Sequence, residues 1–344
     1  MASLKDRRLW GYRMVDVAEV VGAVEDDLTA LLARLRASGD VADEAMAEFL
    51  GSFLGNLAAR GSTGAVNVMI RLPLLVHAAE TGDPAGGRPA AVVHLLWWAA
   101  ARYLDDLADG GPEIRADPAR FNAGILAALG VGSHLPIRLV GEVGVPDATK
   151  VAALAELSRG WLDGISGQLL DYSARPAGAT VASVLASYAG KTGAPYAMAT
   201  AMAACLAGAD PGRVDRWRDV GRRFGVLRQL TNDQRDLVTG RDEDIRNGAA
   251  TFLVMLLLDG VPAAQRSALL ALYASAATSA AARAEFKMRL TAPENLRSYH
   301  GRVDGMLAEV HGALHTLGGA QPYTAALHAL IDEAMLAFPL PAAG

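Results

Sequence analysis

The chain is poor in cysteine and in charged residues. It has one cysteine, Cys205, among 344 residues, so a disulfide framework and a cysteine-based zinc site are both excluded. Charged residues make up only 20% of the chain, and the formal net charge is −5. A negative net charge argues against nucleic acid as the main partner. An apolar core, rather than cross-links, must therefore stabilise the fold.

A long hydrophobic run is missing from the start of the chain. Residues Met1 to Arg8 include basic side chains, but no continuous apolar segment follows them. We therefore expect neither a signal peptide nor an integral membrane segment. Runs of alternating β-branched residues are missing as well. These features predict a cytoplasmic protein without β-sheet.

Hydrophobic residues are abundant, at 52% of the chain, and they recur mostly at helical spacing. Alanine, which is frequent, favours helix. A break is expected at Gly190 to Pro195, where two glycines and a proline interrupt the pattern. No segment is typical of a linker, so the sequence predicts one all-α domain over residues 1–344. The expected helices cover residues 14–35, 43–60, 66–80, 90–108, 121–129, 150–170, 181–206, 211–237, 251–258, 265–290 and 298–338.

Two short segments concentrate oxygen ligands on one face of a helix, at positions i, i+1 and i+4. Carboxylates crowded in this way repel one another, which favours a bound cation. Oxygen ligands suit a hard divalent ion, above all Mg²⁺. Alternatively, the first segment is a solvated helix end in which Arg102 pairs with Asp106. The candidate metal ligands are Asp105, Asp106, Asp109, Asn232, Asp233 and Asp236.

Four ordered motifs resemble those of the trans-isoprenyl diphosphate synthases and their relatives on the class I terpenoid synthase fold. Asp105 to Asp109 is similar to the first aspartate-rich motif, and Gly167 to Asp171 is similar to a glutamine-aspartate segment. Gly190 to Thr192 is similar to a Lys-Thr pair. Gln229 to Asp236 resembles the second aspartate-rich motif, with Asn232 in place of an aspartate. The resemblance implies an all-α isoprenoid synthase bundle with a central cavity.

The resemblance also implies Mg²⁺-dependent ionisation of an allylic isoprenyl diphosphate. Metal ions neutralise the leaving diphosphate in such chemistry, and cationic side chains hold it. Lys191 is the best candidate for the second role. The catalytic residues are then Asp105, Asp109, Lys191 and Asp236, and the substrate-binding residues are Gln168, Asp171, Lys191, Thr192, Arg228, Gln229, Arg241, Arg246 and Trp97.

Trp97 and Trp98 stand two turns before the first aspartate motif, about 10–12 Å along the helix. If either ring faces the cavity, it forms the floor and limits the substrate to 15 or 20 carbons. The alternative is that both rings belong to the core or to an interface. The family commonly forms homodimers, and an apolar helix such as Ala90 to Ala101 would suit that interface.

The chain departs from chain-elongating members of the family near the first motif. Those members carry basic segments for the diphosphate of isopentenyl diphosphate, where this chain has only Arg71 and Arg115. One such side chain is a poor replacement for several charge-assisted partners. We therefore expect cyclisation of a C15 or C20 diphosphate, which would make the protein a terpene synthase. Prenyl transfer, elongating or to another acceptor, and a non-catalytic regulatory role are the alternatives.

Overall fold

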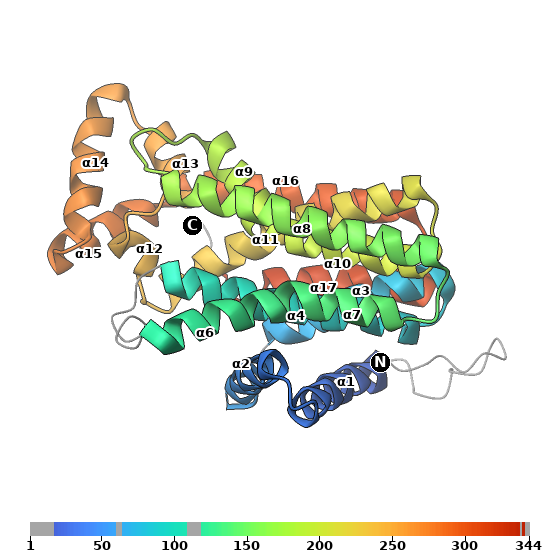
Figure 1. The fold of residues 1–344 in the computed structure, drawn as a ribbon. Coiled ribbons are helices and arrows are strands. Elements are labelled where there is room, and N and C mark those ends of the chain that lie inside the picture. The colour runs from blue at the N-terminus through green and yellow to red at the C-terminus, as the bar shows by residue number, and fades with distance from the viewer. Residues whose placement is uncertain (1–16, 60–63, 109–117, 338, 341–344) are drawn as a thin grey trace. The chain divides into compact units, whose positions relative to one another are not determined.

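The computed structural model describes residues 17–59, 64–108, 118–337 and 339–340. All regular elements within these ranges are helices (Figure 1), which confirms the expected all-α class. The start of the chain, on which the expectation about a signal peptide rests, lies outside them. The elements are α1 (Val17–Ala37), α2 (Val41–Ala59), α3 (Gly64–Thr81), η1 (Ala85–Gly87), α4 (Arg88–Ala108), α6 (Pro118–Leu129), η2 (Gly130–His134), α7 (Leu135–Glu142), α8 (Asp147–Ser173), α9 (Val181–Lys191), α10 (Gly193–Leu206), α11 (Pro211–Val238), α12 (Glu243–Arg246), α13 (Phe252–Gly260), α14 (Ala263–Ala276), α15 (Ala280–Leu290), α16 (Pro293–Leu317) and α17 (Gln321–Met335).

Two of the expected long helices are each divided in two, so those expectations were wrong. Residues 265–290 are split because the side chain of Ser279 accepts a hydrogen bond from a backbone N–H in the first turn of α15, which starts a new helix. Residues 298–338 are split at Gly318 and Gly319, whose φ angles of 63° and 125° end α16. The break expected near Pro195 is present, because α9 ends and α10 begins just before it.

The chain divides into two compact units. Unit 1 comprises residues 1–157, 198–217 and 318–327, and unit 2 comprises residues 158–197, 218–317 and 328–344. The first aspartate motif belongs to unit 1, whereas the other three motifs belong to unit 2. The expectation of a single domain stays a prediction.

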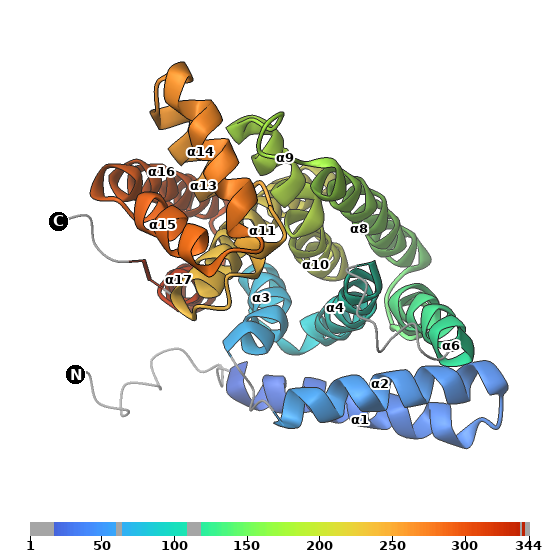
Figure 2. The same cartoon turned by 90° about the vertical axis from the view of Figure 1, so that its left-hand side faces the viewer.

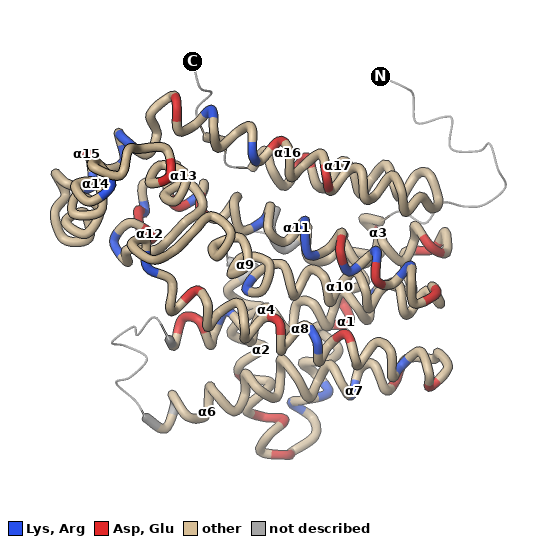
Figure 3. The backbone as a smooth tube through the Cα atoms, turned by 90° about the horizontal axis from the view of Figure 1, so that it is seen from above, with Lys and Arg blue, Asp and Glu red and all other residues tan. Residues whose placement is uncertain are grey.

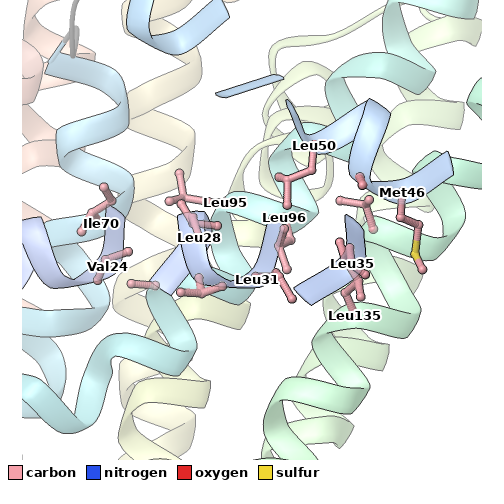
Figure 4. Packing of buried hydrophobic residues seen from close by; sticks show 14 of the residues in the cluster. Val24, Leu28, Leu31, Leu35, Met46, Leu50, Ile70, Leu95, Leu96 and Leu135 are labelled. Carbon is pink, nitrogen blue, oxygen red and sulfur yellow. The ribbon is translucent and has the colours of Figure 1, made fainter. Parts of the chain in front are cut away.

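The core of unit 1 forms where α1 packs against α2, α3 and α4. Buried residues recur along α1 every three or four positions, which places them on one face of that helix. Figure 2 shows α1 and α2 side by side against α3, α4 and α6. Close to the centre of this cluster lie Val24, Leu28, Leu31, Leu95 and Leu96 (Figure 4).

Unit 2 is organised around α13, whose side chains from Phe252 to Met255 are buried. The ring of Phe252 lies 5.8 Å from that of Tyr299 on α16, and Tyr273 of α14 stacks on Phe286 of α15 at 4.4 Å. Acidic and basic residues lie next to one another around α12 (Figure 3). The aromatic contacts hold the helices that surround this charged segment.

One continuous helical stretch, Phe121–Glu142, is long and apolar enough to cross a membrane, with a mean hydropathy of 1.5. Such a signal is weak on its own, because core helices of other proteins pass the same test. The expected absence of a membrane segment stays a prediction.

Candidate functional site

The first aspartate motif lies at the C-terminal end of α4. Asp105 is partly buried, and Asp106 is exposed. The Nε atom of Arg102 lies 4.0 Å from Asp106, which is the pairing weighed from the sequence. Asp109 and Arg115 lie outside the described residues. The metal-binding role of this motif therefore stays a prediction.

The two tryptophans of α4 have different surroundings. Trp97 is buried, and its ring packs edge-on against Trp98 at 5.5 Å. The Nε1 atom of Trp98 donates a 3.0 Å hydrogen bond to Nε2 of His94, while Nδ1 of His94 lies 3.0 Å from the carbonyl oxygen of Met69. Burial lowers the pKa of His94 to about 4, so the ring is neutral and Nδ1 donates. Both tryptophans thus have core contacts. That Trp97 forms the floor of the substrate cavity stays a prediction.

In unit 2, Lys191 ends α9 and faces α8. Its Nζ atom lies 2.9 Å from Oδ2 of Asp171, so the ammonium has a carboxylate partner. The hydroxyl of Ser187 donates to Oδ1 of Asp171 at 3.4 Å and to the Gly167 carbonyl at 3.2 Å. Gln168, which lies on α8 close to Asp171, is partly buried. The glutamine-aspartate segment and the Lys-Thr pair therefore meet in space.

Four glycines let helix backbones touch on both sides of Lys191. A Cβ atom on Gly190 would lie 2.5 Å from the Cα of Gly167, which brings α8 and α9 into direct backbone contact. A Cβ atom on Gly225 would likewise lie 2.5 Å from the Cα of Gly193, where α10 meets α11. Any larger residue would force these helices apart. We call the two contacts the glycine crossings; they fix the position of the Lys-Thr pair.

A chain of hydrogen bonds connects the Lys-Thr pair to the second aspartate motif. Thr192 donates to Oε1 of Gln229 at 2.5 Å, and Nε2 of Gln229 donates to Asp233 at 3.0 Å. The hydroxyl of Tyr188 also donates to Asp233 and accepts the N–H of Phe252 at 3.1 Å. Burial, reinforced by a nearby carboxylate, raises the pKa of Asp233 well above its ordinary value.

Asp236 receives the first turn of α12. Its two carboxylate oxygens accept the backbone N–H groups of Glu243 and Asp244, at 3.0 and 3.1 Å. The Nε atom of Arg241 lies 3.6 Å away. These two hydrogen bonds hold the Asp236 side chain against the start of α12.

Asp244 is a functional candidate that the sequence reasoning missed. It lies on α12 behind Asp236, and burial together with the charge of Asp236 raises its pKa to about 7. The positive charges of Lys191 and Arg241 act in the opposite direction. The available signal was the run of acidic residues from Asp242 to Asp244, shortly after α11 ends at Val238.

The remaining predicted substrate residues are not brought together. Arg228 is buried, and its Nη1 atom donates to the carbonyl oxygen of Ala334 at 3.2 Å, at the C-terminal end of α17. A cation at this end of a helix is favourable, so Arg228 has a structural partner. Asn232 and Arg246 are exposed. Their roles toward substrate and metal stay predictions.

The donors in unit 2 suit a hard cation. Asp233, Asp236 and Asp244 line one small cavity of about 20 Å³ together with Tyr273 and Tyr299. Asp236 is buried and the other two carboxylates are half-buried. Crowding of this kind disfavours the ionised forms, and a divalent ion would relieve that penalty. Among the described residues, no group of three or more His, Cys, Asp or Glu side chains is arranged to hold a metal ion. The fit to Mg²⁺ thus rests on donor chemistry.

Several solved structures have the same fold. A geranylgeranyl pyrophosphate synthase is 16% identical, with a TM-score of 0.77 over 94% of this chain and 99% of that chain. A decaprenyl diphosphate synthase from Rhodobacter capsulatus is 18% identical, with a TM-score of 0.72 over 94% and 100%. A geranylgeranyl pyrophosphate synthase from Corynebacterium glutamicum, complexed with isoprenyl diphosphate and magnesium, is 20% identical, with a TM-score of 0.74 over 94% and 99%. At these identities the likeness establishes the isoprenoid synthase fold.

The family follows from the sequence itself. The profile of the polyprenyl synthetase family matches residues 101–288, which is more than half of the chain. The chain therefore belongs to the polyprenyl synthetase family, whose members are enzymes that act on isoprenyl diphosphates. No curated protein matches the chain.

Proposed function

We propose that the protein ionises an allylic isoprenyl diphosphate with the help of Mg²⁺ and transfers the prenyl group to an acceptor. The observation that carries this proposal is the polar cluster of unit 2. There Lys191 pairs with Asp171, while three further carboxylates crowd together and the pKa of Asp244 is raised to about 7. Such a cluster is costly unless it binds cations and, through them, an anionic group.

The chain's own residues have separate tasks in this reaction. Lys191 binds a diphosphate oxygen, and Asp171 holds the ammonium in place until the substrate arrives. The hydrogen-bonded chain through Thr192 and Gln229 orients Asp233. Asp233, Asp236 and Asp244 would hold Mg²⁺ in unit 2, as Asp105 and Asp109 would in unit 1. When bound, Mg²⁺ supplies electrostatic stabilisation of the departing diphosphate.

The bond changes balance without any further reactant. The allylic C–O bond breaks, and its electron pair leaves with the diphosphate. An electron pair of the acceptor then forms the new bond to the allylic carbon, and the acceptor loses a proton. When no acceptor is bound, water takes its place and the product is a prenyl alcohol.

Membership of the polyprenyl synthetase family favours transfer over cyclisation. Cyclisation of a C15 or C20 substrate, which was expected first from the sequence, is the second candidate. It is supported by the run around Arg71, which has one basic residue where elongating relatives have several. A non-catalytic regulatory role is the outcome if no substrate is ionised.

The test is an incubation of the full chain with geranyl, farnesyl and geranylgeranyl diphosphates, Mg²⁺, and isopentenyl diphosphate present or absent. Diphosphate release and products by mass spectrometry are followed together. We expect Mg²⁺-dependent diphosphate release, with prenyl alcohols from water capture when no acceptor is supplied. Longer diphosphates that require isopentenyl diphosphate would identify elongation, and cyclic hydrocarbons would identify a cyclase. No release from any substrate would refute the proposal.

A further inference from the structure

A pocket of about 300 Å³ lies in unit 1 between α2, α4 and α6. We call it the α2–α4–α6 pocket. Its volume is at the lower end of the range for small-molecule sites. Ala99 lies on its wall, and Asp106 of the first aspartate motif also lines it. The pocket therefore follows the α4 face that carries Asp106.

Aromatic side chains form one wall of this pocket. Phe49 and Phe53 lie one turn apart on α2, and the ring of Tyr103 meets Phe49 edge-on at 5.1 Å. The hydroxyl of Tyr103 lies against Gly124 of α6 and occupies the space that a Cβ atom would need there. Tyr103 is thus held by packing, and the aromatic wall is already formed for an apolar ligand.

The polar residues at the pocket carry more negative than positive charge. Glu48 and Asp106 contribute two carboxylates, and Arg102 contributes one guanidinium, which lies 4.0 Å from Asp106. With no metal ion on the first aspartate motif, a diphosphate placed here would meet two like charges and one cation that is already paired, which is unfavourable. An amine-bearing ligand, which is cationic, would meet complementary charge instead, and a neutral ligand would meet no like charge.

We propose that the α2–α4–α6 pocket binds a small apolar, aromatic-sized molecule whose polar end is neutral or cationic. Its assignment as the acceptor site rests on the proposed function, whereas the binding itself does not. The pocket then explains how a chain with few basic residues before the first motif takes a second substrate: that substrate has no diphosphate.

Matched naphthalene probes test the charge preference. The full chain is titrated with 1-naphthylmethylamine, 1-naphthylmethanol and 1-naphthylacetate, and binding is followed by calorimetry and by naphthalene fluorescence. We expect the amine to bind about tenfold more tightly than the acetate, with the alcohol between them. Equal affinities, the opposite order, or no binding of any probe at millimolar concentration would overturn the proposal.

Two pairs of variants locate the binding. Ala123→Phe fills the pocket from the exposed side of α6, and Asn122→Phe adds the same ring to a neighbouring exposed position that does not line it. Glu48→Lys reverses the charge at the rim, and Glu44→Lys does so one turn earlier, away from the pocket. We expect Ala123→Phe to weaken amine binding about tenfold and Glu48→Lys to shift preference toward the acetate. Each control variant should behave as the unmodified chain does.

Because all four positions are on the surface or rim, folding is checked by circular dichroism and is expected to be intact. If Ala123→Phe nevertheless unfolds the chain, Glu48→Lys alone decides the question. Diphosphate release from farnesyl diphosphate is measured in parallel. If the unmodified chain binds the probes but releases no diphosphate, the proposed function alone is refuted. If it releases diphosphate but binds no probe, the pocket proposal alone is refuted.

Discussion

Lys191 and Asp171, which are twenty residues apart in the sequence, form an ion pair with 2.9 Å between Nζ and Oδ2. Their side chains are 27% and 37% exposed, so a substrate oxygen can reach the ammonium from solvent. Lys191→Ala should lower kcat/KM for an allylic diphosphate by about 10- to 100-fold, the usual effect of losing a charge-assisted hydrogen bond. Diphosphate release at several substrate concentrations measures this.

Lys150 provides the control, because it pairs with the exposed Asp147 at the start of α8. Lys150→Ala should leave kcat/KM within a factor of about two, as expected for a surface pair. Unchanged kinetics in Lys191→Ala would mean that another group binds the diphosphate.

Asp244 should make the metal-free protein less stable as pH rises. Its pKa is about 7 in the folded chain and 3.8 as an ordinary carboxyl, so the folded form binds more protons between these values. The contribution of Asp244 to the free energy of unfolding therefore falls as pH rises from about 4 to 7. Asp244→Asn should remove this slope and stabilise the protein at pH 8 by on the order of 4 kcal/mol.

Urea unfolding at pH 5 and pH 8 in the presence of a chelator measures the effect. Asp304→Asn, at an exposed position on α16, is the control and should change neither value. Added Mg²⁺ should restore the stability that the unmodified chain loses at pH 8 through the ionised Asp244. If the free energy of unfolding changes between pH 5 and pH 8 by the same amount in the unmodified chain and in Asp244→Asn, the raised pKa of Asp244 is contradicted.

His94 should have the opposite effect in acid. Its pKa is about 4 in the folded chain and 6.5 ordinarily, so the unfolded chain binds more protons between these values. Its contribution to stability is complete above about pH 6.5 and is lost as the pH falls toward 4. The loss is on the order of 2–3 kcal/mol. His94→Gln, which retains one donor for Met69 and one acceptor for Trp98, should reduce this loss.

The exposed His134 supplies a matched comparison, because His134→Gln should leave the acid limb of the stability curve unchanged. Thermal unfolding from pH 4 to pH 7 is the measurement. The same acid loss in His94→Gln as in the unmodified chain would show that another group titrates.

The glycine crossings should tolerate no added methyl group. Gly190→Ala would place its Cβ 2.5 Å from the Cα of Gly167, so α8 and α9 must separate. The expected cost is about 1–3 kcal/mol, with a fall in kcat as Lys191 moves. Gly141→Ala, on α7 with open space around it, should be neutral or stabilising by about 0.5–1 kcal/mol. Equal stability of the two variants in urea would refute the close contact.

Self-association is expected through α8 and not through α4, because the apolar side chains of α4 from Ala90 to Ala100 are almost all buried. Leu162, Ile165 and Leu169 lie on one face of that helix and are 65%, 51% and 61% exposed. An exposed apolar stripe of this kind commonly marks a protein interface. A Leu162→Glu and Leu169→Glu double variant should convert a dimer to a monomer in light scattering after gel filtration, whereas Val41→Glu, at another exposed apolar position, should not. A chain that is monomeric before any substitution would contradict this prediction.

The sequence predicted most helices, because local spacing and glycine breaks carry that information. The contacts among the three motifs of unit 2 are seen only in the structure. The sequence placed Lys191 at a helix break, and the break is present. It did not reveal that Tyr188 would bond to Asp233, since those residues are 45 positions apart and neither spacing nor composition connects them. The role of Asp236 at the start of α12 also depends on a turn that the pattern does not specify.

Other features could not be predicted from sequence patterns, because single small residues produce them. The α2–α4–α6 pocket depends on alanines and on Gly124, which form no motif in the sequence. The separation of α14 from α15 depends on one capping side chain, Ser279, inside a region of strong helical propensity.

The glycine crossings also limit how this site can change over generations. A side chain added at Gly167 or Gly190 would push α8 and α9 apart and displace Lys191, so a single mutation there costs both stability and activity. The α2–α4–α6 pocket has no such constraint at Ala123, which is exposed and can vary alone. The ligand of the α2–α4–α6 pocket can therefore change by single substitutions, whereas the position of the Lys191 ammonium is constrained.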